Sequence, residues 1–197
     1  MDLERLRQEA ARCRACPLWE RATQTVFGAG ASPAPMMVVG EQPGDREDRE
    51  GKPFVGPAGL LLDQALAQAD VPREAVYVTN VVKHFKWEPR GKRRIHKKPN
   101  AQEILACRPW LEAEIAAVAP RLIVALGATA AQALLGRQFR VSEARGEAKE
   151  SPWGIPTVAT VHPAAVLRAP EEELRRQERA AFFADIRAAA RMLRRAD

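Results

Sequence analysis

Residues 90–98 form a run rich in Lys and Arg that contains a single histidine, His96. Cationic side chains neutralise phosphates and release condensed counterions, so the run predicts a contact with nucleic acid. A neutral imidazole adds little to phosphate binding, but near neutral pH it is a good nucleophile or proton carrier. His96 is therefore a candidate reagent inside a phosphate-binding loop. The alternative is that the whole run is a solvated basic surface.

Polar side chains also lie at the ends of apolar segments that we expect to form strands. Glu41 and His162 each follow such a segment directly, and Asn80 lies towards the end of a third. In an open parallel sheet, ligands bind at the carboxyl ends of the strands. The sequence therefore predicts a carboxylate, an amide and an imidazole that converge on one sheet edge, beside the basic loop.

Asn80 and Phe54 are candidates for recognising a planar base. One amide can accept from a ring N–H and donate to a neighbouring carbonyl, which matches the Watson–Crick edge of uracil or thymine but not of cytosine. Phe54 lies in a glycine-rich turn, where a ring among small residues can stack on a base. The structural alternatives are a hydrogen-bonded turn asparagine and a core aromatic. For His162-Pro163 the alternative is simply a helix start.

Cys13 and Cys16 form a C-x2-C pair, a spacing that suits two thiolates on one metal ion or cluster. Cys107 is a candidate third ligand, and His84, just past the second expected strand, is the best fourth donor. An odd number of cysteines argues against a disulfide framework. Spacing does not separate zinc from iron–sulfur. The alternative is a pair of free thiols and a buried, apolar Cys107.

The chain has 197 residues, which suits a single domain spanning 1–197. The net charge of +6 favours an anionic partner. No apolar run approaches the roughly 20 residues of a membrane-spanning helix, so we expect no membrane partner. The first residues have mixed charge and lack an apolar signal core, which predicts a cytoplasmic protein.

The hydrophobic pattern predicts an α/β fold. Four apolar segments have the pattern of buried strands: 36–40, 76–82, 122–127 and 157–161. Apolar residues at helical spacing predict helices over 3–14, 59–69, 101–118, 128–135 and 171–195. Strands that alternate with helices indicate a three-layer α/β/α sandwich around a central four-stranded, mainly parallel sheet. The first helix precedes this alternation and is expected to pack on its outside.

Six short motifs stand in order along nearly the whole chain. They are Cys13-x2-Cys16, Gly40-Glu41-x-Pro43-Gly44, Pro53-Phe54-Val55-Gly56, Thr79-Asn80-Val81-Val82-Lys83, Ala106-Cys107-x-Pro109 and His162-Pro163. This ordered set resembles the uracil-DNA glycosylase superfamily, in particular its iron–sulfur-containing family 4 branch. The resemblance implies the uracil-DNA glycosylase fold.

Three departures from the ordinary family 4 pattern resemble one subgroup. Gln42 stands where that family usually has alanine, and His84 stands where its third cluster cysteine is expected. An inserted basic loop at about 86–99 carries Lys92-Arg93-Arg94-Ile95-His96. Together they resemble the UdgX type, whose members become covalently attached to uracil-containing DNA. A further departure is Ala164, where many relatives have serine, and we expect it only to tune the rate.

The resemblance implies a cofactor and two sets of DNA contacts. The cofactor is a [4Fe–4S] cluster held by Cys13, Cys16, His84 and Cys107, distant from the chemistry and structural in role. Contacts with the flipped uracil are implied for Phe54, Asn80 and Gln42. Contacts with flanking phosphates are implied for Lys92, Arg93 and Arg94.

The resemblance also implies a reaction. His162 stabilises the anion that develops on the departing uracil. Neutral His96 then attacks C1′ of the sugar in place of water and stays bonded to it, while Glu41 accepts its proton. Gln42 and Asp45 help to place the loop and the sugar.

Two alternatives stand beside this hypothesis. One is an ordinary turnover family 4 glycosylase in which the basic loop only binds DNA. The other is a non-enzymatic protein with an iron–sulfur or zinc site that binds DNA. The expected partner of the glycosylase is uracil-containing DNA, single-stranded DNA included, and the expected state is a monomer.

Overall fold

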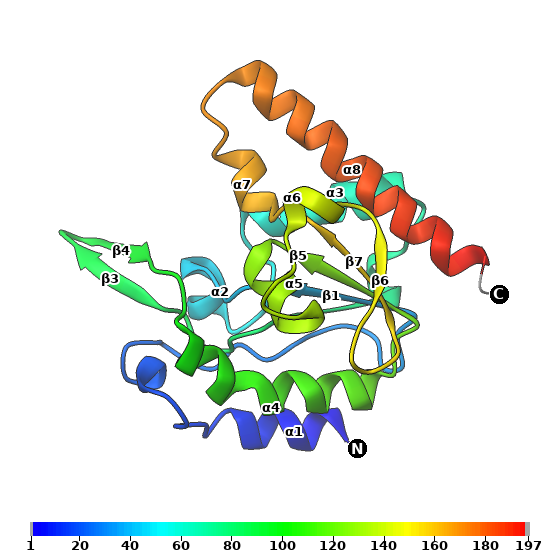
Figure 1. Cartoon of the computed structure of the whole chain (residues 1–197). Helices are drawn as coiled ribbons and strands as arrows, with labels where there is room; N and C mark the ends of the chain where they lie inside the picture. The colour runs from blue at the N-terminus through cyan, green and yellow to red at the C-terminus, as the bar shows by residue number, and fades with distance from the viewer. Residues whose placement is uncertain (1, 196–197) are drawn as a thin grey trace.

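A five-stranded sheet forms the centre of the computed structural model, which describes residues 2–195 (Figure 1). The strand order is β2-β1-β5-β7-β6. The four strands that the sequence predicts are all present and mutually parallel: β1 Met36–Gly40, β2 Val76–Asn80, β5 Leu122–Leu126 and β7 Pro156–Thr160. The predicted fold class is therefore confirmed. The fifth strand, β6 Ala148–Glu150, adds an antiparallel edge that was not predicted, because its three residues are exposed and carry no apolar pattern.

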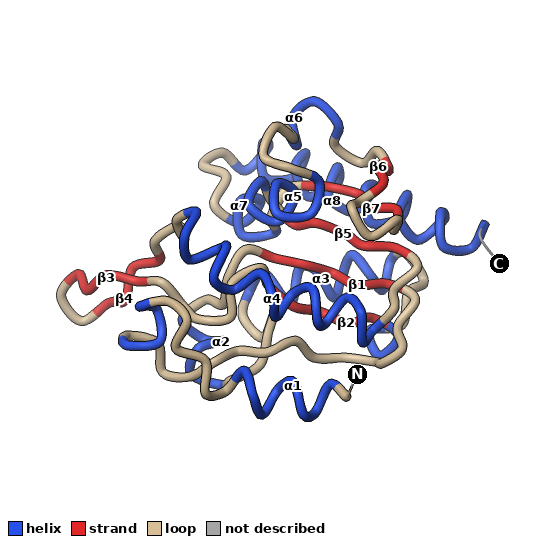
Figure 2. Tube along the Cα trace, turned by 60° about the horizontal axis from the view of Figure 1, so that its bottom comes forward, coloured by secondary structure: helices blue, strands red, loops and turns tan. Residues whose placement is uncertain are grey.

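The central strands are apolar along their whole length because both faces of the sheet are covered. In β1, Met36 and Val38 face one core, while Met37 and Val39 face the other. The first core is closed by α3 Pro57–Gln68, α7 Pro163–Leu167 and α8 Glu172–Arg195. The second is closed by α4 Ala101–Val118 and α5 Ala128–Leu135. The three-layer arrangement follows from these two cores (Figure 2).

The N-terminal helix α1 Leu3–Ala10 packs on the outside of α4, as predicted, through Leu6 and Ala10. It ends earlier than the predicted boundary at residue 14. A 3-10 turn, η1 Pro17–Glu20, follows it, and a second, η2 Arg73–Ala75, leads into β2. A short helix, α6 Val141–Ala144, connects α5 to β6.

The acidic segment after β1 forms a helix, α2 Asp45–Glu50. Its Glu47 carboxylate accepts from the backbone N–H of Gly44 at 3.1 Å and of Gly56 at 2.8 Å. Carboxylates in the first turn also interact favourably with the helix dipole. Glu47 thereby joins α2 to the turn that precedes α3.

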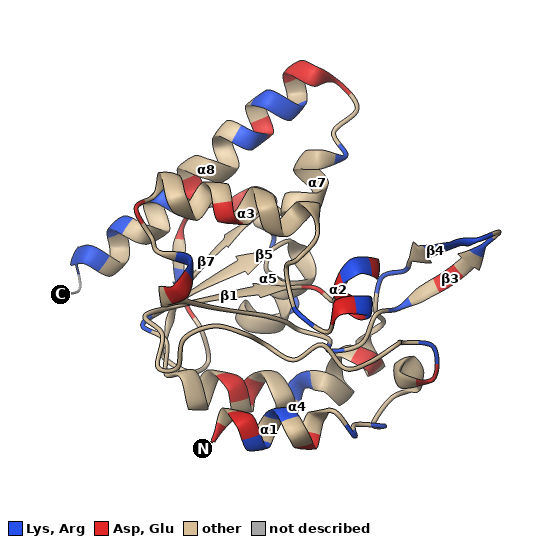
Figure 3. Cartoon of the chain, turned by 180° about the vertical axis from the view of Figure 1, so that it is seen from behind, with Lys and Arg blue, Asp and Glu red and all other residues tan. Residues whose placement is uncertain are grey.

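The basic loop expected at 86–99 is a β-hairpin, formed by β3 Trp87–Arg90 and β4 Arg93–His96. It projects from the body of the molecule, and Lys and Arg residues gather along β4 (Figures 1 and 3). Gly91, with φ 58°, takes the first central position of the tight turn, where a positive φ favours glycine. At its base, Trp87 Nε1 donates to the carbonyl of Arg21 at 2.9 Å.

Among residues 2–195, no helix combines the length and apolar character that crossing a membrane requires.

A buried ion pair joins the end of β2 to α4. Lys83 Nζ lies 2.6 Å from Glu114 Oε2, and both side chains are almost fully buried. Lys83 Nζ also donates to Thr79 Oγ1 at 2.7 Å, while Glu114 Oε1 accepts from the Tyr77 hydroxyl at 2.9 Å. The Glu114 carboxylate also accepts from the backbone N–H of Gly28 at 2.9 Å, so this pair holds three segments together.

Replacing Lys83 with methionine should lower the free energy of unfolding by about 3–5 kcal/mol, because Glu114 would stay buried without its counter-charge. Urea unfolding of the purified protein measures this loss. The matched control is Lys97→Met, which removes an exposed pair with Glu88 and should cost less than about 1 kcal/mol. Equal losses in the two variants would contradict the assignment.

Candidate active site

A cavity of about 830 Å³ opens at the carboxyl edge of the sheet, between α2, α7 and the hairpin. Eight of the predicted site residues line it together: Glu41, Gln42, Asp45, Phe54, Asn80, Arg94, His96 and His162. The predicted convergence of strand ends therefore takes place. Lys92 and Arg93 do not line the cavity, since they lie exposed at the hairpin turn and just after it.

His96 and Glu41 face each other at the cavity. His96 Nε2 lies 3.3 Å from Glu41 Oε1, and the Thr129 hydroxyl donates to the other carboxylate oxygen, Oε2, at 2.5 Å. Burial alone would raise the pKa of Glu41, but the bonds from His96 and Thr129 and the charge of Lys98 outweigh it and lower this pKa. The site therefore holds an ionised carboxylate beside an imidazole whose side chain is 49% exposed.

Gln42 determines where the hairpin leaves the body. Its Oε1 accepts from the backbone N–H of Lys86 at 2.9 Å, and its Nε2 donates to the carbonyl of Lys97 at 2.8 Å. These two residues flank the hairpin on either side. Both ends of the amide are thus used on the hairpin backbone, which fits the predicted role in placing the loop. The implied contact of Gln42 with the base has no comparable support.

Arg94 is an anchor of the hairpin rather than a free phosphate ligand. Its guanidinium pairs with Asp45 and, at 2.6 Å, with Asp48 Oδ2, and its side chain is only 13% exposed. It also lies over the rings of Phe85 and Trp87, at 5.3 and 5.4 Å from their centroids. The phosphate contact that the family resemblance implies for Arg94 stays a prediction. Asp45, in contrast, contacts the loop as expected.

Phe54 and Asn80 both lie close to Gly40 at the end of β1. Gly40 pairs with Asn80 across β1 and β2, and a Cβ at Gly40 would meet Asn80 Oδ1 at 2.4 Å and the Phe54 ring at 2.8 Å. Phe54 itself has a φ of 56°, a strained conformation for a side chain of this size. Nowhere in residues 2–195 does the Asn80 side-chain amide find a hydrogen-bond partner, although the residue is 3% exposed. A buried amide without a partner is available to a ligand.

His162 lines the same cavity and is a neutral hydrogen-bond donor. It caps α7, where its Nδ1 accepts from the backbone N–H of Ala164 at 3.1 Å. The remaining proton of the neutral ring is therefore on Nε2. Burial lowers the pKa of His162 to about 4, against the opposing attraction of Glu41. Its ring stacks towards Phe54, with centroids 6.3 Å apart and an interplanar angle of 23°.

Four further residues belong to this cavity although the sequence did not single them out as site residues. Phe85 lies under His96, with ring centroids 6.2 Å apart, and Thr129 positions Glu41. Lys98 and Arg168 line the mouth. Two of them carried a signal in the sequence, since Thr129 follows an expected strand at its carboxyl end and Lys98 belongs to the basic run 90–98. The others depend on how the hairpin and α7 fold back over the edge.

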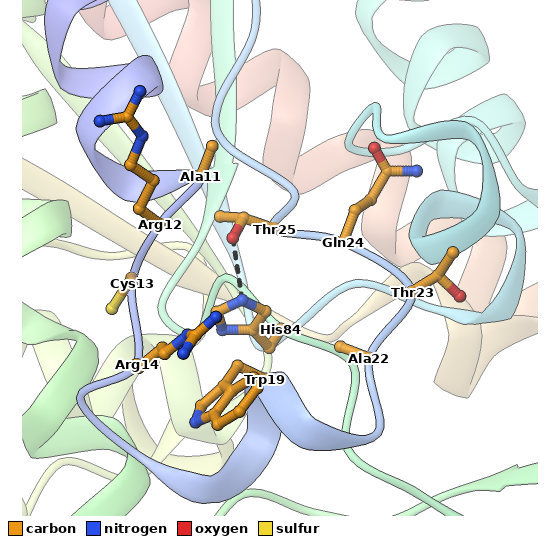
Figure 4. A pocket seen from close by; sticks show the side chains of 10 residues that line it. All are labelled: Ala11, Arg12, Cys13, Arg14, Trp19, Ala22, Thr23, Gln24, Thr25 and His84. Atoms are coloured by element: carbon orange, nitrogen blue, oxygen red, sulfur yellow. Dashed lines mark hydrogen bonds between the residues drawn. The ribbon is translucent and has the colours of Figure 1, made fainter.

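The predicted metal ligands come from the N-terminal segment, the end of β2 and α4. Burial raises the pKa of the Cys107 thiol to about 11 against the opposing charge of Lys83, and the nearby Cys13 and Cys16 contribute to the rise. His84 and Cys13 line a neighbouring cavity of about 420 Å³ (Figure 4). In the described part of the chain, however, no three His, Cys, Asp or Glu side chains are arranged to hold a metal ion.

The chemistry of these donors fits a thiolate-rich centre. The three cysteines are free thiols. The Thr25 hydroxyl lies 3.1 Å from the carbonyl oxygen of Ala10 and 2.8 Å from His84 Nε2, and one arrangement satisfies all three groups: the hydroxyl donates to Ala10 and accepts from the Nε2–H of His84 (Figure 4). His84 is then protonated on Nε2 and has its lone pair on Nδ1, which is the form of imidazole that ligates a metal.

Comparison with known proteins gives a consistent result. The family model of the uracil DNA glycosylase superfamily matches residues 27–187. A type-4 uracil-DNA glycosylase of Pyrobaculum aerophilum is 40% identical over 177 residues, which cover 86% of this chain and 87% of the relative. The type-4 enzyme of Thermotoga maritima is 38% identical over 175 residues, covering 88% of each chain. That of Saccharolobus solfataricus is 35% identical, covering 91% of this chain and 86% of the relative.

The low pKa of His162 makes stability depend on pH. Between about pH 6.5 and 4 the unfolded chain binds a proton at this residue that the folded chain does not, so stability should fall as pH falls through this window. His162→Gln should make that fall shallower in denaturant unfolding across the pH range. Nitrogen NMR of the wild-type imidazole should report the Nε2–H tautomer until about pH 4. An imidazole that titrates near pH 6.5 would contradict the assignment.

Proposed function

This chain belongs to the uracil DNA glycosylase superfamily and is a uracil-DNA glycosylase. We propose that, after releasing uracil, it stays covalently joined to the sugar of the DNA through His96. One observation carries the proposal. His96 Nε2 lies 3.3 Å from the ionised Glu41, at a cavity whose other walls hold an unpartnered amide and a neutral histidine. Such a pair is a nucleophile beside a proton acceptor.

The base is recognised by Asn80 and Phe54. A glycosylase takes its target nucleotide out of the stack, so it needs a pocket that replaces stacking and pairing. The free amide of Asn80 suits the N3–H and O4 edge of uracil, and the ring of Phe54 offers a face for stacking. Both groups lie against Gly40, where a Cβ would meet each of them.

His162 stabilises the leaving group. Cleavage of the C1′–N1 bond sends its electron pair into uracil, which departs as an anion. A neutral Nε2–H donor whose tautomer is fixed by Ala164 can hydrogen-bond that anion as its charge develops. The low pKa of His162 keeps the ring neutral at physiological pH, so it stabilises the anion through a hydrogen bond and not by transferring a proton.

The covalent step replaces water with imidazole. The ring nitrogen of His96 that holds the lone pair bonds to C1′ as the bond to uracil breaks, and the N–H proton on the other ring nitrogen passes to Glu41. Thr129 keeps Glu41 oriented through its second oxygen. Gln42 and Arg94 hold the hairpin so that His96 stays at the cavity.

An ordinary turnover enzyme is the second candidate, and the identity of 38–40% to relatives named type-4 uracil-DNA glycosylases favours it. In that case water attacks C1′ and His96 only contacts DNA. Since all residues around the cavity come from one chain, a monomer suffices under either mechanism. Single-stranded DNA suits both, because an unpaired nucleotide enters the cavity without breaking a base pair.

We further propose that Cys13, Cys16, Cys107 and His84 hold a [4Fe–4S] cluster. Support comes from the effect of Cys13 and Cys16 on the pKa of Cys107, and from the Nδ1 lone pair that His84 can offer to a metal. When bound, the cluster supplies a cross-link between the N-terminal segment, the end of β2 and α4. Its ligands lie outside the cavity that holds His96, which favours a structural role.

Wild-type protein mixed with a uracil-containing oligonucleotide should give a shifted band that survives denaturing electrophoresis. His96→Ser should abolish this band yet still release uracil, since water then reaches C1′. Ile95→Ser, at the neighbouring exposed position, is the matched control and should keep the adduct. A denaturant-resistant adduct in His96→Ser would overturn the nucleophile assignment. Uracil release by the wild type without any adduct would favour the turnover enzyme.

The cluster proposal predicts a brown protein that contains iron and acid-labile sulfide. Cys107→Ser should lose both the visible absorbance and the iron, because a buried thiolate ligand is gone. Thr25→Val should weaken iron retention by releasing the His84 tautomer. Zinc in place of iron in the purified wild type would contradict the proposal.

A further inference from the structure

Four Lys or Arg side chains line the cavity, and they divide into two kinds. Arg46 pairs with Glu50 at 2.7 Å, and Arg94 pairs with Asp45 and Asp48. Lys98 and Arg168, the other two, are exposed and make no hydrogen bond or ion pair through their side chains with any residue from 2 to 195. Their charges are therefore available to an anion at the cavity mouth.

These two free cations lie on different elements around the reacting groups. Lys98 follows β4, and its charge helps to lower the pKa of Glu41. Arg168 caps the C-terminus of α7, and its charge adds to the effect of burial in lowering the pKa of His162. Figure 1 shows β4 and α7 on different sides of the carboxyl edge of the sheet. A nucleotide held between Glu41 and His162 thus has one cation near each wall.

We propose that Lys98 and Arg168 bind the two phosphates that flank the flipped nucleotide, one on each side of it. The inference rests on the proposed glycosylase function, because that function places a sugar between them. Phosphate binding is thus assigned to two cations at the cavity mouth and not to Arg94 of the hairpin, which is already paired with Asp45 and Asp48.

The chemistry of the two side chains suits this division. The Arg168 guanidinium presents a planar fork that binds two phosphate oxygens at once, whereas the Lys98 ammonium acts as a mobile point charge. Phosphate contacts fix the register of a strand without reading its sequence. A backbone held on both sides would keep C1′ in place while the base leaves.

The salt dependence of binding tests the proposal without using catalysis. The probe is a single-stranded oligonucleotide with a tetrahydrofuran abasic analogue, which has no base to release. Removing one cation that binds a phosphate should shrink the slope of log K against log salt concentration by about 0.7. Lys98→Ala and Arg168→Ala should each show this change, and the double variant about twice as much.

Two further variants make the result specific. Arg191→Ala, on the exposed side of α8, removes the same charge far from the cavity and should leave the slope unchanged. Arg168→Lys should keep the slope, because the charge remains, but weaken binding because the planar fork is absent. Slopes that stay at the wild-type value in both alanine variants would overturn the proposal. Failure of the wild type to release uracil would instead refute the proposed function and leave the slopes interpretable.

Discussion

The buried Lys83 connects the proposed active site to the proposed cluster site. Its Nζ donates to the backbone carbonyl of Asn80 at 2.5 Å, and its backbone N–H donates to Cys107 Sγ at 3.2 Å. Glu114 neutralises it and collects hydrogen bonds from Tyr77, Thr79 and Gly28. Burying two charges is costly and is weak evidence of extra stability, so the arrangement is better understood as fixing geometry. Here it fixes the end of β2, on which the amide of Asn80 depends.

The β3–β4 hairpin is an element of low intrinsic stability whose position is fixed by contacts with the body of the protein. Two exposed strands of four residues each are at best marginally stable alone in water. Arg94 stabilises the hairpin through two carboxylates and two aromatic faces, and Gln42 fixes both of its ends. Arg94 and Gln42, which the sequence suggests as a DNA ligand and a base ligand, thus help to hold His96 in place. A residue's type predicts what it can bind, but its packing decides which partner it has.

The sequence predicts most of the sheet because buried parallel strands are apolar throughout. It also predicts both ends of α4 and of α5 correctly. It also brings Glu41, Asn80 and His162 to one edge, because the end of a parallel strand has a fixed place. It does not predict the hairpin, whose exposed strands lack a hydrophobic pattern. Nor does it distinguish Arg94 from Arg93, since only the tertiary structure puts Asp48 beside one of them. Arg168 goes unnoticed for the same reason, whereas Lys98 belongs to the basic run 90–98 that the sequence singles out.

Burial acts on two titratable groups of the cavity, Glu41 and His162, and leaves one charged and the other neutral. Burial opposes the charged form of Glu41 and of His162 alike. Glu41 stays ionised because hydrogen bonds from His96 and Thr129 stabilise its anion, whereas His162 has no such partner for a cation and stays neutral. A carboxylate and a departing uracil anion are then close together, and their repulsion would oppose the reaction. The free charges of Lys98 and Arg168 lie near these two groups and offset part of that repulsion. The cations that hold the DNA backbone therefore also favour the charge separation on which cleavage depends.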